Sequence, residues 1–172
     1  MRKVGTIFVF ILLISAYRFA NKEKQNVSST TNNEVVSVEQ VSVNVSKADE
    51  VIEIADSYKG VGYKFGGTDN NGMDCSGLVY TSFKKIGIQL PRTSKAMSAK
   101  GSKIDLNNVQ RGDLIFFNID RLQGNINHVG LVVDTDNYNV VFIHSSTSKG
   151  VTVSSLEEDY WKDAFVVVKR VL

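Results

Sequence analysis

The chain of 172 residues contains one cysteine, Cys75, and two histidines, His128 and His144. Cys75 stands where a glycine-rich stretch ends and a pattern with helical periodicity begins. Unpaired backbone N–H groups and the positive end of the helix dipole stabilise a thiolate at such a position, so we expect a lowered pKa for this thiol. A cysteine with histidines far away in the sequence is the usual arrangement of a thiol nucleophile and its base.

The two histidines lie on a predicted β-hairpin formed by residues 128–133 and 140–145. A turn centred on Asp136 would place His128 directly opposite His144, with Cβ atoms about 4.5–5.5 Å apart. We interpret His128 as the general base and His144 as the residue that orients it. The alternatives are two ordinary half-buried histidines, or a zinc site with Cys75. The opposed positions favour catalysis, and no metal or cofactor is expected.

Asp74 directly precedes the predicted helix, and both an N-cap role and a substrate-binding role remain open for it. Its negative charge would oppose thiolate formation unless a cation neutralised it. Arg92 is the candidate partner, although it could equally be a surface charge.

The elements that must position these residues change type along the chain. Helical patterns come first, at residues 46–60, 75–87 and 94–100, with Ser46 as a capping residue. Residues 61–74, which include four glycines, are predicted to form a structured loop. Strand patterns follow at 114–117, 128–133, 140–145, 151–153 and 165–171. This order predicts an α+β fold, with N-terminal helices packed on a mostly antiparallel sheet of about five strands.

The N-terminal part of the chain differs from the rest in composition. Residues 1–20 combine Arg2 and Lys3 with an apolar run, which is typical of a secretory signal peptide or an uncleaved N-terminal anchor. Residues 21–45 are polar and are predicted to be a flexible linker before a domain at 46–172. The net charge of +2 depends on the basic residues of the first segment, so nothing indicates a nucleic-acid partner. We expect export to the cell envelope or beyond it.

Several short motifs resemble those of the NlpC family of bacterial cell-wall cysteine peptidases. The motifs occur in the family's order, and the resemblance covers residues 46–172. They are YKFGG at 63–67, DCSGLV at 74–79, LPRTS at 90–94, GDLIFF at 112–117, HVGL at 128–131 and FIH at 142–144.

The resemblance implies a compact papain-like fold and a triad of Cys75, His128 and His144. It also implies that Tyr63 binds substrate or assists the oxyanion. The substrate would be a peptidoglycan stem peptide, cut between D-glutamate and the diamino acid. Met97 departs from the family, which often has glutamine there, and this affects subsite preference rather than the triad. The positions that would shape the acceptor pocket are Asp74, Ser76 and Arg92.

The leading hypothesis is therefore an exported cysteine endopeptidase that acts as a monomer on peptidoglycan. An N-terminal membrane tether is compatible with it. Two alternatives use the same residues differently. One is an amidase or acyltransferase acting on another acyl compound, and the other is a non-catalytic envelope-binding module on the same scaffold.

Overall fold

The computed structural model of the protein describes residues 45–136 and 139–172, so the predicted leader and almost all of the predicted linker lie outside the described residues. The capping role of Ser46 is confirmed, because its Oγ accepts the Asp49 N–H at 3.1 Å. Within the two described ranges, no helix is long and apolar enough to cross a membrane. The helices are α2 (Lys47–Asp56), α3 (Cys75–Lys85), α4 (Ser94–Ser98), α5 (Asp159–Ala164) and the 3₁₀ helix η1 (Leu106–Asn108).

The main sheet is antiparallel throughout and has the strand order β3-β8-β4-β5-β6-β7. The predicted α+β class is confirmed. The sheet has one strand more than expected, because a short segment after α4 pairs with β8. The six strands are β3 (Ser102–Ile104), β4 (Leu114–Phe117), β5 (His128–Asp136), β6 (Asn139–Ser146), β7 (Gly150–Ser155) and β8 (Phe165–Arg170).

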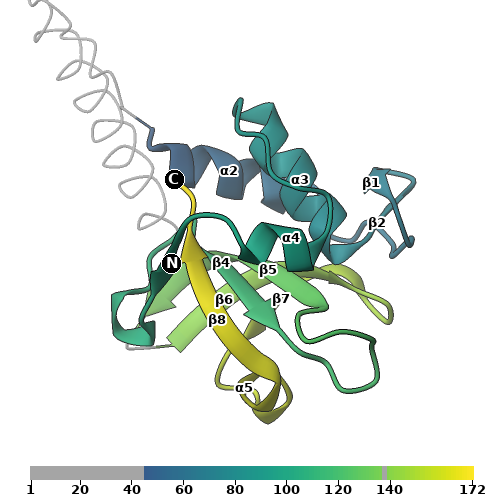
Figure 1. Ribbon diagram of the computed structural model, residues 1–172. Coiled ribbons are helices and arrows are strands. Elements are labelled where there is room, and N and C mark those ends of the chain that lie inside the picture. The colour runs from purple at the N-terminus through teal and green to yellow at the C-terminus, as the bar shows by residue number, and fades with distance from the viewer. Residues whose placement is uncertain (1–44, 137–138) are drawn as a thin grey trace, which may run out of the picture. The chain divides into compact units, whose positions relative to one another are not determined.

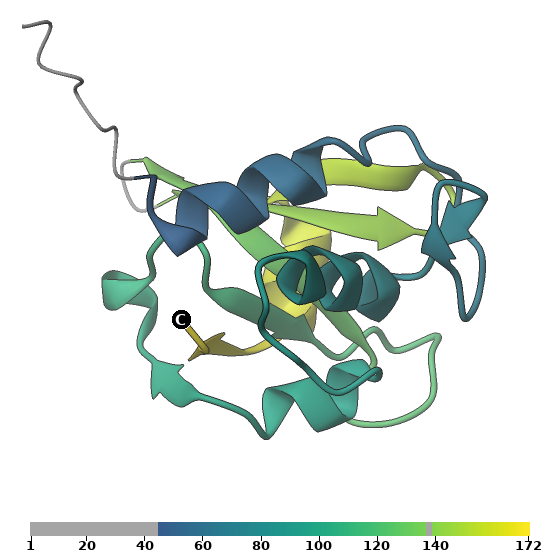
Figure 2. The ribbon, with the colours of Figure 1, turned by 90° about the horizontal axis from the view of Figure 1, so that it is seen from above.

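Helices α2 and α3 lie together on one face of this sheet (Figures 1 and 2). Helix α3 packs against β5 and β6, and α2 packs against α3. Both helices bury an apolar stripe at helical spacing, which includes Val51 and Ala55 in α2 and Leu78 and Phe83 in α3. Full burial of a valine, leucine or phenylalanine side chain stabilises the fold by about 1.5–3 kcal/mol. This core fixes the start of α3 relative to β5.

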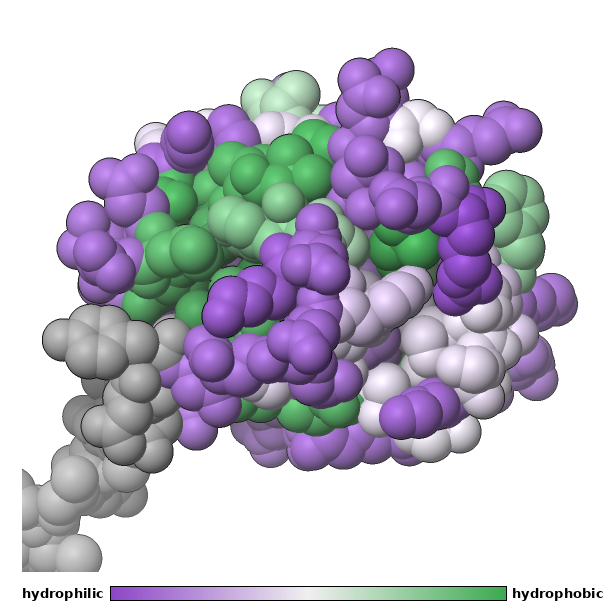
Figure 3. Space-filling model, turned by 90° about the horizontal axis from the view of Figure 1, so that it is seen from below, coloured by the Kyte–Doolittle hydropathy of each residue, from purple (hydrophilic) through white to green (hydrophobic). Residues whose placement is uncertain are grey.

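The opposite face of the sheet carries a second core, and α5 lies on this side (Figure 1). Trp161 of α5 packs there against Phe117 and Phe142. Viewed from this side, apolar side chains are gathered across part of the surface (Figure 3). Val140, Leu156 and Phe165 are among the residues lining a hollow of about 220 Å³.

The hairpin that carries the histidines has a different register from the predicted one. Leu131 pairs with Ile143, whereas a turn centred on Asp136 would have paired Leu131 with Val141. The expected direct opposition of His128 and His144 is therefore wrong by two positions. The strands continue to the pair Asp136 and Asn139, and an irregularity between Val132 and Asp134 shifts the pairing by one residue. A shift of two keeps side chains on the same face, so the two imidazoles can still meet.

Candidate functional site

Cys75 is the first residue of α3, as predicted. The preceding stretch is more ordered than a loop, because it contains the short antiparallel strands β1 (Thr68–Asp69) and β2 (Gly72–Met73). Asp74 is the N-cap of α3: its Oδ1 accepts the Gly77 N–H at 2.6 Å. The backbone N–H groups of Cys75 and Ser76, at the start of this helix, favour the thiolate form of Cys75.

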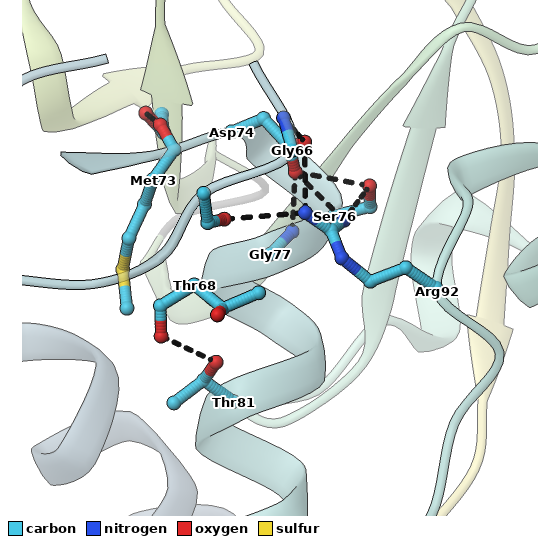
Figure 4. Close-up of polar contacts among 10 residues, drawn as sticks. Gly66, Thr68, Met73, Asp74, Ser76, Gly77, Thr81 and Arg92 are labelled. Carbon is cyan, nitrogen blue, oxygen red and sulfur yellow. Dashed lines mark hydrogen bonds and ion pairs between the residues drawn. The ribbon is translucent and has the colours of Figure 1, made fainter. Parts of the chain in front are cut away.

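Arg92 binds the Asp74 carboxylate through two nitrogens (Figure 4). Both N–O distances are 2.9 Å, and the guanidinium also donates to Ser76 Oγ at 2.9 Å and to the Gly67 carbonyl at 3.2 Å. The predicted partnership of Arg92 and Asp74 is therefore confirmed. The pair ties the start of α3 to the glycine-rich segment and to the chain before α4.

Gly77 allows the close approach that this network needs. A Cβ at this position would lie 2.0 Å from the Gly67 carbonyl oxygen, 3.0 Å from Asp74 Oδ1 and 3.1 Å from Arg92 Nη2. Any larger residue would push the glycine-rich segment away from the helix. The glycine in the DCSG motif is therefore explained by packing of backbone against backbone.

The imidazoles of His128 and His144 are hydrogen bonded to each other, with 3.0 Å between His128 Nε2 and His144 Nδ1. They are 5% and 1% exposed, respectively, which is unusual for histidine. Trp161 holds both rings, stacking on His128 at 5.3 Å between centroids and meeting His144 edge-on at 4.7 Å. One nitrogen of His128, Nδ1, is left to serve as a base.

Cys75, His128, His144 and Tyr63 all line one cavity of about 340 Å³. A buried hydrogen bond connects the two halves of the site: the hydroxyl of Ser145, which follows His144, donates to the Met73 carbonyl at 2.7 Å. The strand with the second histidine is thereby attached to the segment that leads into the nucleophile.

The other predicted pocket residues lie elsewhere. Asp74, Ser76 and Arg92 do not line this cavity and are engaged with one another beside the start of α3. Their contacts give Asp74 a helix-capping role, and a direct substrate-binding role for the three residues stays a prediction.

A comparison with known families agrees with this geometry. The sequence model of the NlpC/P60 family matches residues 60–170, which contain all of the site residues described in this subsection. The chain belongs to the NlpC/P60 family.

Among its relatives is the murein DD-endopeptidase MepS/murein LD-carboxypeptidase of Escherichia coli strain K12. It is 34% identical over 181 residues, covering 100% of this chain and 93% of the relative. The gamma-D-glutamyl-L-lysine dipeptidyl-peptidase of Bacillus cereus is 32% identical over 126 residues, covering 73% of this chain and 37% of the relative.

Solved NlpC/P60 structures share the fold. A family protein from Bacillus cereus superposes with a TM-score of 0.66 at 32% identity, covering 73% of this chain and 40% of that one. The peptidoglycan hydrolase RipB from Mycobacterium tuberculosis gives a TM-score of 0.60 at 28% identity, covering 73% and 65%.

The expected lowering of the Cys75 pKa is wrong for the resting protein. Burial raises the pKa of the Cys75 thiol to about 11, and the negative charge of Asp74 adds to this effect. Backbone N–H groups of Val129, Ser76 and Cys75 itself act in the opposite direction but do not outweigh burial. Burial likewise lowers the pKa of His128 to about 3. Both shifts disfavour charge, so this NlpC/P60 site rests as a thiol beside a neutral imidazole.

Alkylation of the thiol tests this resting state. Cys75 is the single cysteine of the chain, so iodoacetamide labelling reports on it alone. With a thiol pKa of about 11, we expect the rate to rise nearly tenfold per pH unit from pH 6 to pH 9, because the thiolate fraction rises in that way. A rate that stays flat across this range would instead indicate a preformed thiolate–imidazolium pair. Cys75→Ala protein, which has no thiol, serves as the negative control for labelling.

Sequence reasoning missed three residues of the site. Ser154 of β7 lies 3.1 Å from His144 Nε2, Trp161 packs on both imidazoles, and Ser145 binds the Met73 carbonyl. The chain has a single tryptophan, which was the one available signal. Ser145 and Ser154 stand in a serine-rich region and offered no such signal, because their partners lie on other elements, 72 and 10 residues away in the sequence.

Proposed function

We propose that this protein is an exported cysteine peptidase that hydrolyses amide bonds in peptidoglycan stem peptides. One observation carries the proposal: the hydrogen-bonded pair of His128 and His144 lines the same cavity as the single thiol, at the start of α3. The name of the Escherichia coli relative, which includes murein endopeptidase and carboxypeptidase activities, supports the substrate class.

The catalytic cycle follows from the resting protonation states. Cys75 Sγ attacks the amide carbon while its proton passes to the free Nδ1 of His128. The backbone N–H groups at the start of α3 stabilise the resulting oxyanion, and loss of one such donor typically costs about 10²–10³ in rate. His128 then protonates the leaving nitrogen, which produces a thioester. With His128 again acting as base, water attacks the thioester and restores the thiol.

The charges in the cavity suit an acidic peptide. Arg121 and Lys149 line it, and neither forms an ion pair with any residue in the described ranges. Glu158 also lines the cavity, but its carboxylate accepts the Ser155 N–H at 2.9 Å. Stem peptides carry free carboxylates on D-glutamate and on the terminal residue, so two unpaired cations favour their binding.

The N-terminal segments support the location of this activity. The basic and apolar residues 1–20 would direct export to the envelope, with the leader either removed or retained as a tether. Residues 21–45 would then serve as a linker that lets the catalytic domain at 46–172 reach the wall as a monomer.

Digestion of defined muropeptides tests the substrate and the bond. We expect the purified full-length protein to cut disaccharide-tetrapeptide between D-glutamate and the diamino acid, which mass spectrometry would detect as a new amino terminus on the diamino acid. Release of alanine alone would contradict this bond preference and favour a carboxypeptidase. If every muropeptide stayed intact while iodoacetamide still labelled Cys75, the proposed substrate class would be wrong.

A further inference from the structure

A line of hydrogen bonds extends beyond the two histidines. His128 Nε2 meets His144 Nδ1 at 3.0 Å, and His144 Nε2 meets Ser154 Oγ at 3.1 Å. Ser154 lies on β7 opposite Phe142, two residues from His144 on β6, so it occupies the same face of the sheet as His144. The three side chains form one hydrogen-bonded line along the wall of the cavity.

During catalysis, the hydrogen bonds along this line determine which ring nitrogens carry a hydrogen. After His128 has taken the thiol proton, both of its nitrogens carry hydrogen, and Nε2–H must donate to His144 Nδ1. His144 then has to carry its own hydrogen on Nε2. The described atom positioned to accept that hydrogen is Ser154 Oγ.

We propose that Ser154 is a positioning residue that supports the charged state of His128 through His144. This inference rests on the proposed function for its role in hydrolysis. By accepting the Nε2–H of His144, Ser154 keeps His144 Nδ1 available as an acceptor. The imidazolium of His128 is thereby stabilised when it forms. Ser154 also lines the cavity, but its proposed role acts through the ring of His144.

The burial of His144 makes Ser154 Oγ important as a hydrogen-bond acceptor. His144 is 1% exposed and is held edge-on by Trp161, so it cannot turn to find another partner without breaking that packing. A buried N–H without an acceptor is costly, and the cost rises when the ring is polarised by a neighbouring positive charge. Ser154 accepts this hydrogen at rest as well, and the bond matters more in the charged intermediate, because the positive charge on His128 polarises the ring of His144.

The matched variants are Ser154→Ala, Ser154→Thr and Ser155→Ala. Threonine keeps the hydroxyl, and alanine removes it. Ser155 is the next residue of β7. Its Oγ donates to Asn139 Oδ1 at 2.6 Å and accepts the Glu157 N–H at 3.0 Å, away from the histidines. Ser155→Ala thus removes hydroxyl hydrogen bonds from the same strand and reports the purely structural effect.

We expect Ser154→Ala to lower kcat on muropeptides roughly tenfold, because a hydrogen bond to a charged group is lost in the transition state, while KM stays nearly unchanged. Ser154→Thr should restore most of kcat, and Ser155→Ala should leave it near the wild-type value. Equal losses of kcat in Ser154→Ala and Ser155→Ala would overturn the proposal.

A second measurement needs no substrate, so its result is separate from that of the proposed function. The chain has two histidines, so ¹⁵N-labelled imidazoles give two simple sets of NMR signals. In wild type, we expect His144 to be protonated at Nε2 and unprotonated at Nδ1. Ser154→Ala should move these shifts toward a mixture of tautomers. Shifts identical to the wild type, with kcat unchanged, would refute the role of Ser154.

Discussion

Replacing Cys75 with alanine is expected to reduce amide hydrolysis at least about 10³-fold, because alanine has no sulfur to attack the amide and form the thioester. The loss should appear in kcat, since the cavity walls that bind the peptide are unchanged. Muropeptide hydrolysis followed by chromatography and mass spectrometry provides the measurement.

Ser82→Ala is a suitable control for this variant. Ser82 lies in the same helix, is fully buried, and its hydroxyl donates to the Leu78 carbonyl at 2.9 Å. We expect it to cost some stability but to leave hydrolysis within about twofold of wild type. Activity in Cys75→Ala comparable to that of Ser82→Ala would exclude thiol catalysis.

Replacing Arg92 with leucine is expected to destabilise the fold by about 3 kcal/mol. The Asp74 side chain is 11% exposed, and removal of Arg92 would leave its carboxylate buried without a counter-charge. The estimate lies at the low end for a broken buried pair, because the Arg92 side chain is 34% exposed and water screens part of the interaction. Urea denaturation at pH 7 would measure the difference.

The loss of folding stability in Arg92→Leu should depend on pH. Although burial acts to raise the pKa of Asp74, hydrogen bonds from Arg92, Gly77 and Gly66 together lower it below 3.8. A lowered pKa means that this carboxylate stabilises the fold above about pH 4 and loses that contribution as the pH falls. The difference between wild type and Arg92→Leu should therefore be largest near neutrality and narrow in acid.

Two further variants separate charge from packing. Asparagine is as good an N-cap as aspartate, so adding Asp74→Asn to Arg92→Leu should recover part of the lost stability by removing the buried charge. Asp56→Ala breaks the exposed ion pair with Lys59, whose side chains are each 48% exposed, and should cost less than about 0.5 kcal/mol. If Arg92→Leu were as mild as Asp56→Ala, the buried network would not be what holds α3 in place.

Much of the site was predictable because its signals are local. A cysteine directly after a capping aspartate places the thiol at a helix start, and Asp74 does cap α3. The histidines were placed on one face by the period of two along a strand, which survives a register error of two residues. Arg92 was identified as the partner of Asp74 from charge alone, and the bidentate contact agrees with it.

The order of residues along the chain was thus enough to identify the thiol, its two histidines, the α+β class and the family motifs. These features could be predicted because capping, periodicity and charge act over a few residues. Tertiary structure decided the rest. The pairing of β5 with β6 depends on an irregularity near Val133, and Ser154 and Trp161 reach the imidazoles from β7 and α5. The helix start alone predicted a thiolate at Cys75, whereas burial in the assembled fold raises the pKa of this thiol to about 11. Desolvation depends on all the groups packed around the thiol, most of which are distant in the sequence, and so it could not be predicted from the residues next to Cys75.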